Sequence, residues 1–193
     1  MRLRADEPRG ARVTCAAAGA AGGAGRDPAA ALRGPAAIRG PAPRLAAGDR
    51  VLLYGIGNDL RGDDGAGPAV ARALDGRVPW TVCVVHGLTP ELADALVEAD
   101  LALFVDAAAD PTLDAPTWVA HDAPAPGRGG QLLGHALDVP GLLAWCVALH
   151  GRAPRAATLS LPARDFSLGE TLTPTAEAGV AAAVAALLAL ARG

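Results

Sequence analysis

Acidic and imidazole side chains follow several apolar runs of this sequence, at the points where those runs end. Asp63 and Asp64 come after the glycine-rich stretch "GIGNDLRG", Asp106 ends the run "LALFV", and His135 follows a second glycine-rich stretch. Two carboxylates and an imidazole form a ligand set that suits a divalent transition metal. Asp64, Asp106 and His135 are therefore the first candidates for chemistry, provided that the fold brings them together.

The sequence contains three other histidines, and Asp106 lies at the end of a fully apolar run. His86, at the end of the run "TVCVV", is a second imidazole candidate, whereas we expect His121 and His150 to be solvent residues. Burying a lone carboxylate costs several kcal/mol unless it has a partner. Asp106 is therefore either a hydrogen-bonded acid at a strand end or a residue with a metal or another group beside it.

Gly55 and Gly57 could instead begin a dinucleotide-binding turn. The GxGxxG fingerprint requires a third glycine where this chain has Leu60. The acid that would hold a ribose at the end of the second strand is replaced by His86. The paired aspartates that follow would also repel a pyrophosphate, so the nucleotide-binding interpretation ranks second.

The paired aspartates have a structural alternative as helix caps, because carboxylates are favourable at helix N-termini. Pro68 lacks an N–H group and fits only in the first turn, so regular helical bonding should begin near Gly65. We expect that at least one of Asp63 and Asp64 is then free for another role.

The elements that must position these residues alternate along the chain from Arg50. Apolar runs predict strands at residues 50–57, 81–87, 101–110, 115–122 and 155–163. Segments of helical length lie at 63–76, 89–100, 138–151 and 173–193, with Thr89, Asp138 and Thr173 as expected caps. Strands that are apolar on both faces predict a mostly parallel sheet between two helical layers, a three-layer α/β sandwich. Such folds collect their chemistry at the carboxyl ends of the strands.

Composition separates residues 1–49 from residues 50–193. The first segment consists mainly of Ala, Gly, Pro and Arg without periodicity, which predicts a disordered extension; a start codon assigned too far upstream would also produce it. Residues 1–50 contain nine arginines and four acids, and residues 51–193 contain eight arginines and sixteen acids. An acidic body argues against a nucleic-acid surface.

Cysteine usage and hydropathy bear on location. Three cysteines without a CxxC or Cys/His spacing indicate neither a disulfide framework nor a structural zinc site. The N-terminus lacks the apolar core of a secretory signal, and no run of 18 purely apolar residues predicts a membrane span. We therefore expect a cytoplasmic protein that does not bind membranes.

Five sequence blocks, in this order and spacing, resemble the hydrogenase maturation proteases. They are "GIGNDLRGDDGAG", "HGLTPELADAL", "LFVDAA", "GHALDVPGLLAWC" and "DFSLGETLTPTAEAGV". The resemblance implies a twisted five-stranded sheet of the phosphorylase/hydrolase type. It also implies an endopeptidase that removes a C-terminal extension from the large subunit of a nickel-iron hydrogenase after nickel insertion. The metal-contacting positions of the family fall on Asp64, Asp106 and His135; the first is a glutamate in some members.

The resemblance implies a peptidase of the aspartic or metal-dependent type, with Asp64 and Asp106 as catalytic residues. The metal would be nickel held by the substrate, so no resident cofactor is expected. Asn58, Asp63 and His86 are candidates for a loop that contacts substrate. We expect a monomer whose partner is the hydrogenase large-subunit precursor. A nucleotide-binding domain and a non-catalytic nickel-sensing chaperone are the alternatives.

Overall fold

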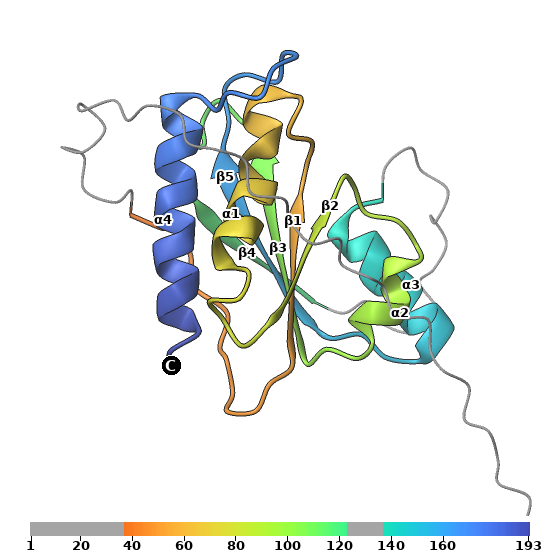
Figure 1. Cartoon of the computed structure of the whole chain (residues 1–193). Coiled ribbons are helices and arrows are strands. Elements are labelled where there is room, and N and C mark those ends of the chain that lie inside the picture. The colour runs from red at the N-terminus through yellow and green to blue at the C-terminus, as the bar shows by residue number, and fades with distance from the viewer. Residues whose placement is uncertain (1–36, 123–136) are drawn as a thin grey trace, which may run out of the picture.

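A single five-stranded sheet forms the centre of the protein. The structure is a computed structural model, and it describes residues 37–122 and 137–193. The strand order is β2-β1-β3-β5-β4 (Figure 1). The strands are β1 (Val51–Ile56), β2 (Thr81–Val85), β3 (Leu101–Ala108), β4 (Thr117–His121) and β5 (Arg155–Pro162). All neighbouring strands pair in parallel except β4, which runs antiparallel to β5. The predicted mostly parallel sheet is confirmed.

Helices cover both faces of the sheet, as the sequence predicts. α1 (Ala66–Leu74) and α4 (Pro174–Leu190) pack on one face, and α2 (Leu92–Leu96) and α3 (Val139–His150) pack on the other (Figure 1). The three-layer α/β sandwich is therefore confirmed. None of the helices within the described ranges is long and apolar enough to cross a membrane.

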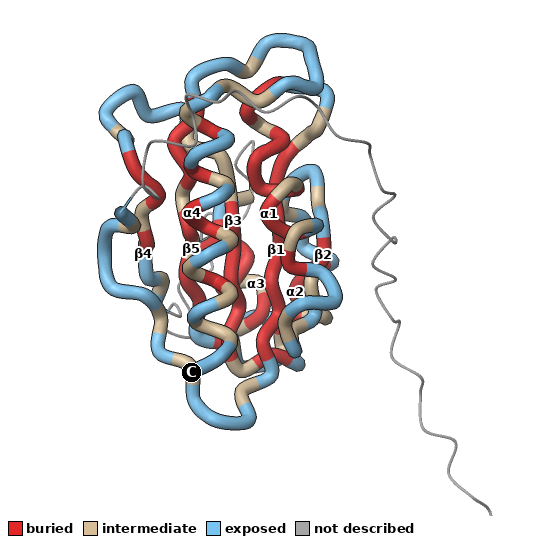
Figure 2. The backbone as a smooth tube through the Cα atoms, turned by 60° about the vertical axis from the view of Figure 1, so that its left-hand side comes forward, coloured by how far each residue is buried: buried red, intermediate tan, exposed pale blue. Residues whose placement is uncertain are grey.

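Strand alternation decides which side chains face which helical layer. On β3, Leu103 and Val105 belong to the apolar cluster under α1 and α4, while Phe104 belongs to the cluster under α2 and α3. The central strands β1 and β3 are buried along most of their length (Figure 2). Because successive side chains point to opposite faces, Asp106 shares the α2 and α3 side with Phe104.

The helix starts differ in part from the predicted ones. A short 3-10 turn, η2 (Gly62–Gly65), precedes α1, and no side chain caps either element. α2 starts at Leu92 without a side-chain cap, so the cap predicted at Thr89 is wrong. The other two caps are confirmed, because Asp138 accepts from the Gly141 amide and Thr173 accepts from the Ala176 amide.

Part of the predicted extension, residues 37–49, contacts the folded domain. The Arg39 amide donates to the Pro116 carbonyl at 2.8 Å, and the Trp118 amide donates to the Arg39 carbonyl at 2.9 Å. Ile38 and Leu45 pack against the core under α1 and α4. A few backbone hydrogen bonds and two apolar side chains therefore hold this segment against the sheet and α4 layer. Residues 1–36, the rest of the predicted extension, lie outside the described residues.

Candidate functional site

The glycines of the first motif bring the start of α1 close to the end of β1. A Cβ atom on Gly55 would lie 2.4 Å from the Gly67 carbonyl oxygen, and one on Gly67 would lie 2.3 Å from the Ile56 oxygen. Both distances are far below van der Waals contact, so neither position accepts a side chain. The motif therefore serves close packing of backbone on backbone, which fixes the loop between β1 and α1.

That loop holds Asp64 at the carboxyl end of β1. Gly57 has a φ of 138°, and a Cβ atom there would lie 1.8 Å from the Asp64 carbonyl oxygen. The Asp64 carboxylate accepts a hydrogen bond from the Asn58 amide at 2.9 Å, and the Asn58 side chain accepts from the Leu60 amide at 2.9 Å. Asp64 is half-buried. Its side chain is thus fixed by its own loop and does not cap a helix.

Asp106 lies next to this loop, on β3 opposite Ser160 of β5. Burial raises the pKa of Asp106 to about 6; a hydrogen bond from the Ala107 amide opposes this rise, and the negative charge of Asp64 adds to it. Two carboxylates influence each other in this way only when they are close in space. The fold therefore brings together two of the three residues that the sequence selects.

Asp63 points away from the site and is fully buried. Its carboxylate accepts hydrogen bonds from the amides of Arg164, Asp165 and Thr173 and from the Thr173 hydroxyl, at 2.6 to 3.2 Å. Burial alone would raise the pKa of Asp63, but these hydrogen bonds outweigh it and lower the pKa. Asp63 is a structural latch between two loops, and it is neither a helix cap nor exposed to a substrate.

The two candidate histidines, His86 and His135, differ in whether the structure describes them. His86 is exposed at the end of β2, with its Nδ1 atom 3.2 Å from the Gly57 carbonyl oxygen, so it borders the loop that holds Asp64. His135 lies outside the described residues. Among the residues that are described, no three His, Cys, Asp or Glu side chains are grouped so as to hold a metal ion.

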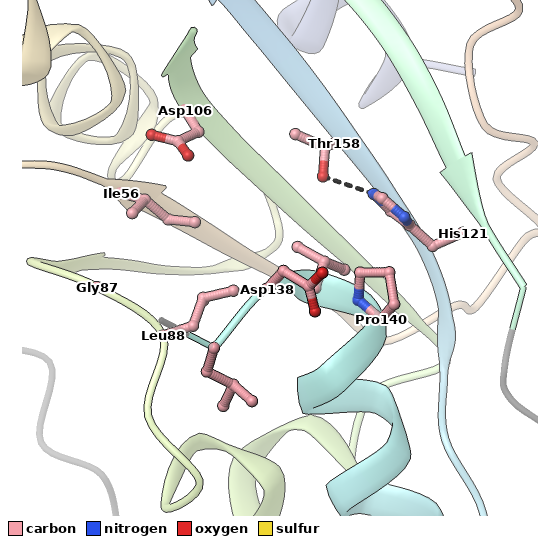
Figure 3. Close-up of a pocket in the computed structure, with 10 residues that line it drawn as sticks. Ile56, Gly87, Leu88, Asp106, His121, Asp138, Pro140 and Thr158 are labelled. Atoms are coloured by element: carbon pink, nitrogen blue, oxygen red, sulfur yellow. Dashed lines mark hydrogen bonds between the residues drawn. The ribbon is translucent and has the colours of Figure 1, made fainter. Parts of the chain in front are cut away.

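A cavity of about 570 Å³ adjoins Asp106 on the α2 and α3 side of the sheet (Figure 3). It lies between the sheet, the Gly87–Leu88 loop and the start of α3, and most of its wall is apolar. The residues that line it are Ile56, Gly87, Leu88, Asp106, His121, Leu137, Asp138, Val139, Pro140 and Thr158.

His121 lines this cavity, so its prediction as a solvent residue is wrong. Its Nε2 atom lies 2.8 Å from the Thr158 hydroxyl oxygen (Figure 3), and burial lowers its pKa although the charge of Asp138 opposes this. Side chains alternate between the two faces of β4, so His121 lies on the face opposite to that of the buried Trp118. Only the pairing of β4 with β5 shows that the other face lines a cavity. His150, by contrast, is exposed and pairs with Asp94 at 2.9 Å.

Comparison with solved structures identifies proteins of the same fold. The NiFe hydrogenase maturation protease HycI from Thermococcus kodakarensis superposes with a TM-score of 0.56 and 22% identity, over 76% of this chain and 96% of its own. The hydrogenase maturating endopeptidase HybD from E. coli superposes with a TM-score of 0.54 and 21% identity, over 74% and 92%. An endopeptidase from Escherichia coli superposes with a TM-score of 0.55 and 25% identity, over 74% of this chain and 92% of its own. The sequence matches no protein-family model and no curated protein.

These superpositions show that the chain has the fold of the hydrogenase maturation proteases. Each covers more than nine-tenths of the solved chain, so the whole fold is shared and not a fragment of it. The resemblance in the sequence blocks and the resemblance in structure therefore point to the same proteins.

Proposed function

We propose that this protein is a hydrogenase maturation endopeptidase, which removes the C-terminal extension of a nickel-iron hydrogenase large-subunit precursor after nickel insertion. The observation that supports this most directly is that Asp64 and Asp106 both lie at the carboxyl ends of neighbouring strands, where the loop after β1 lies against Val105 of β3. The same fold occurs in proteins described as maturation proteases. Function in such sheets is located at that edge.

In this proposal nickel is part of the substrate. Asp64, Asp106 and His135 would add oxygen and nitrogen ligands to nickel that cysteines of the precursor already hold. The Asp64 carboxylate accepts one hydrogen bond, from Asn58, through a single oxygen atom, and its other oxygen accepts none from the described residues. Cleavage becomes conditional on metal loading, because a precursor without nickel lacks the group that these three side chains bind.

The reaction adds water to the carbonyl carbon of the scissile peptide bond. The C–N bond then breaks and leaves a new carboxylate and a new amino group. Nickel near the bond could polarise its carbonyl oxygen, or one carboxylate could accept a proton from the water. A pKa of about 6 for Asp106 suits the second route, because a general base works best when its pKa lies near the working pH.

Neighbouring groups would help to position the substrate. Asn58 lies in the loop that holds Asp64 and His86 borders it, and both would contact the precursor chain there. A pyrophosphate in such a fold binds at the start of the helix after β1, where this chain has the half-buried carboxylate of Asp64, which would repel it. Nothing in this geometry favours the nucleotide-binding alternative.

The test is to mix the full chain with a nickel-loaded large-subunit precursor and to follow the precursor's C-terminus by mass spectrometry. We expect loss of a short C-terminal peptide, which requires nickel and stops in Asp64→Asn and Asp106→Asn. Asp94→Asn is the matched control, since Asp94 is an exposed carboxylate paired with His150, and it should cleave normally. Binding without any change in mass would instead indicate a chaperone, and thermal stabilisation by NAD without a response to nickel would indicate a nucleotide-binding domain.

A further inference from the structure

We propose that the cavity beside Asp106 is a subsite for an uncharged, mainly apolar stretch of the substrate peptide next to the scissile bond. His121 and Thr158 form its hydrogen-bonding anchor. The inference rests on the proposed function, and it adds two specificity-determining residues that lie on β4 and β5. Both strands are distant in sequence from the residues of the motif around Asp64.

The walls of the cavity fit a peptide better than an ion. Ile56, Leu88, Leu137 and Val139 contribute aliphatic surface from three different parts of the fold. A volume of about 570 Å³ lies within the range of roughly 300–1,000 Å³ that is typical of ligand sites. Burial of apolar side chains in such a space stabilises a complex by about 25 cal/mol per Å² of apolar surface removed from water.

Asp106 connects the cavity to the carboxylate pair. It lines the cavity on the sheet side, and the carbonyl of the preceding residue, Val105, lies against Gly67 at the end of the loop that holds Asp64. If the scissile bond of a peptide lies at Asp106, the residues next to that bond therefore extend into this cavity. The wall opposite the sheet is the start of α3, with Asp138 and Pro140 (Figure 3).

The polar groups of the cavity disfavour an anionic ligand. Asp138 is already engaged as the cap of α3, because its carboxylate accepts from the Gly141 amide at 2.8 Å. Burial lowers the pKa of His121, so the imidazole is neutral at neutral pH and offers no charge to an anion. Neutral imidazole has one donor and one acceptor nitrogen, which suits a peptide amide or carbonyl group.

One ring nitrogen of His121 is available for such a hydrogen bond. Its Nε2 atom is engaged with the Thr158 hydroxyl, while Nδ1 makes no hydrogen bond within the described residues. The hydroxyl holds the ring orientation, and because it can donate or accept a hydrogen bond it is compatible with either tautomer. Thr158 is therefore a positioning residue, and His121 is the group that contacts the peptide.

The experiment is steady-state cleavage of the nickel-loaded precursor by variants of the full chain. We expect His121→Ala to raise KM about tenfold with kcat changed less than twofold, and Thr158→Val to raise KM about threefold. His121→Gln, which keeps a donor and an acceptor, should recover part of the loss. His150→Ala is the matched control, because His150 is exposed at the far end of α3. Unchanged KM in folded His121→Ala, with wild type cleaving, overturns the subsite.

A second measurement needs no substitution and separates this inference from the proposed function. The chain has four histidines, so their ring ¹⁵N signals can be assigned in the full protein. A synthetic peptide that copies the precursor's C-terminal segment should shift the His121 signals and leave those of His150 in place. If wild type cleaves no precursor, the proposed function fails, while a shift at His121 without one at His150 still supports peptide binding. No shift at His121 at a saturating peptide concentration overturns the subsite.

Discussion

The carboxylate of Asp63 binds Thr173 twice, because both the amide and the hydroxyl of Thr173 donate to it, at 2.6 and 2.8 Å. The same threonine hydroxyl caps α4 by accepting from the Ala176 amide. Asp63 directly precedes Asp64, so the residue that fixes the start of α4 also fixes the backbone of the carboxylate site. A buried structural acid and a candidate functional acid are thus adjacent in the sequence and point in opposite directions.

Asp63→Ala should lower the free energy of unfolding by about 3 kcal/mol or more. The substitution leaves three amides of the 164–173 segment without their acceptor, and hydrogen bonds to charged groups contribute roughly 1.5–3 kcal/mol each. Urea denaturation measures the change. Asp94→Ala, at an exposed ion pair, should cost less than about 1 kcal/mol. Equal losses in the two variants would contradict the role of Asp63 as a latch.

The latch should also make the fold sensitive to acid. The pKa of Asp63 is lower in the folded state than in the unfolded chain. Its contribution to stability is therefore complete above its ordinary pKa, near 4, and is lost as pH falls through the lower folded value. The stability difference between wild type and Asp63→Asn, measured from pH 7 down to pH 2, should shrink at the acid end. A constant difference over that range would rule out this linkage.

Asp106→Asn should stabilise the fold at pH 8 by up to roughly 2–3 kcal/mol, while it abolishes cleavage. The folded pKa of about 6 exceeds the ordinary value of 3.8, so ionised Asp106 opposes folding. This penalty is absent below about pH 4, grows between pH 4 and 6, and is complete above pH 6. Denaturation at pH 8 and at pH 4 should show a large difference from wild type only at pH 8.

Asp64→Asn should lower the pKa of Asp106 without restoring its ordinary value. Burial is the larger cause of the raised pKa and remains in the variant, while the charge of Asp64 is removed. Carboxyl ¹³C NMR titration of Asp106 in both proteins measures this. The variant Asp59→Asn removes an exposed acid that pairs with Arg72 and should leave the midpoint unchanged. An unchanged midpoint in Asp64→Asn would mean that the two carboxylates do not interact.

Gly57→Ala should be far more damaging than Gly76→Ala. Both glycines have a positive φ, of 138° and 69° respectively. The added Cβ at position 57 would overlap the Asp64 backbone, whereas position 76 has nothing within 4 Å. We expect a cost of about 1–2 kcal/mol at Gly76 from backbone strain alone, and a larger cost with loss of cleavage at Gly57. Thermal melts and the precursor assay compare them, and similar melts would contradict the packing argument.

Removal of residues 1–49 should destabilise the domain, whereas removal of residues 1–36 should leave unchanged every contact described here. The segment 37–49 contributes two backbone hydrogen bonds at Arg39, an Arg39 ion pair with Asp114, and the apolar side chains of Ile38 and Leu45. We expect the longer truncation to lower the melting temperature by several degrees relative to the shorter one. Equal melting temperatures would return the domain boundary to residue 50.

The sequence by itself determined the layers of the fold and the strand ends that carry two of the candidate site residues. Apolar runs that alternate with helical segments are a local signal, because the central strands are apolar on both faces. The starts of α3 and α4 are also local, since Asp138 and Thr173 cap them. Parallel strands bring their carboxyl ends to one edge, so Asp64 and Asp106 could be placed together before any coordinates were known. The glycine spacing marked the loop that holds the first of them.

Only the tertiary structure decided what the neighbouring residues do. The partners of Asp63 lie about a hundred residues further along the chain, so nothing local distinguishes it from Asp64. The role of His121 depends on the antiparallel pairing of β4 with β5, which sets the face of the strand that meets Thr158. Strand register and loop contacts join residues that are far apart in the sequence, so they depend on the packing of the whole chain. The residue types within one segment do not predict them.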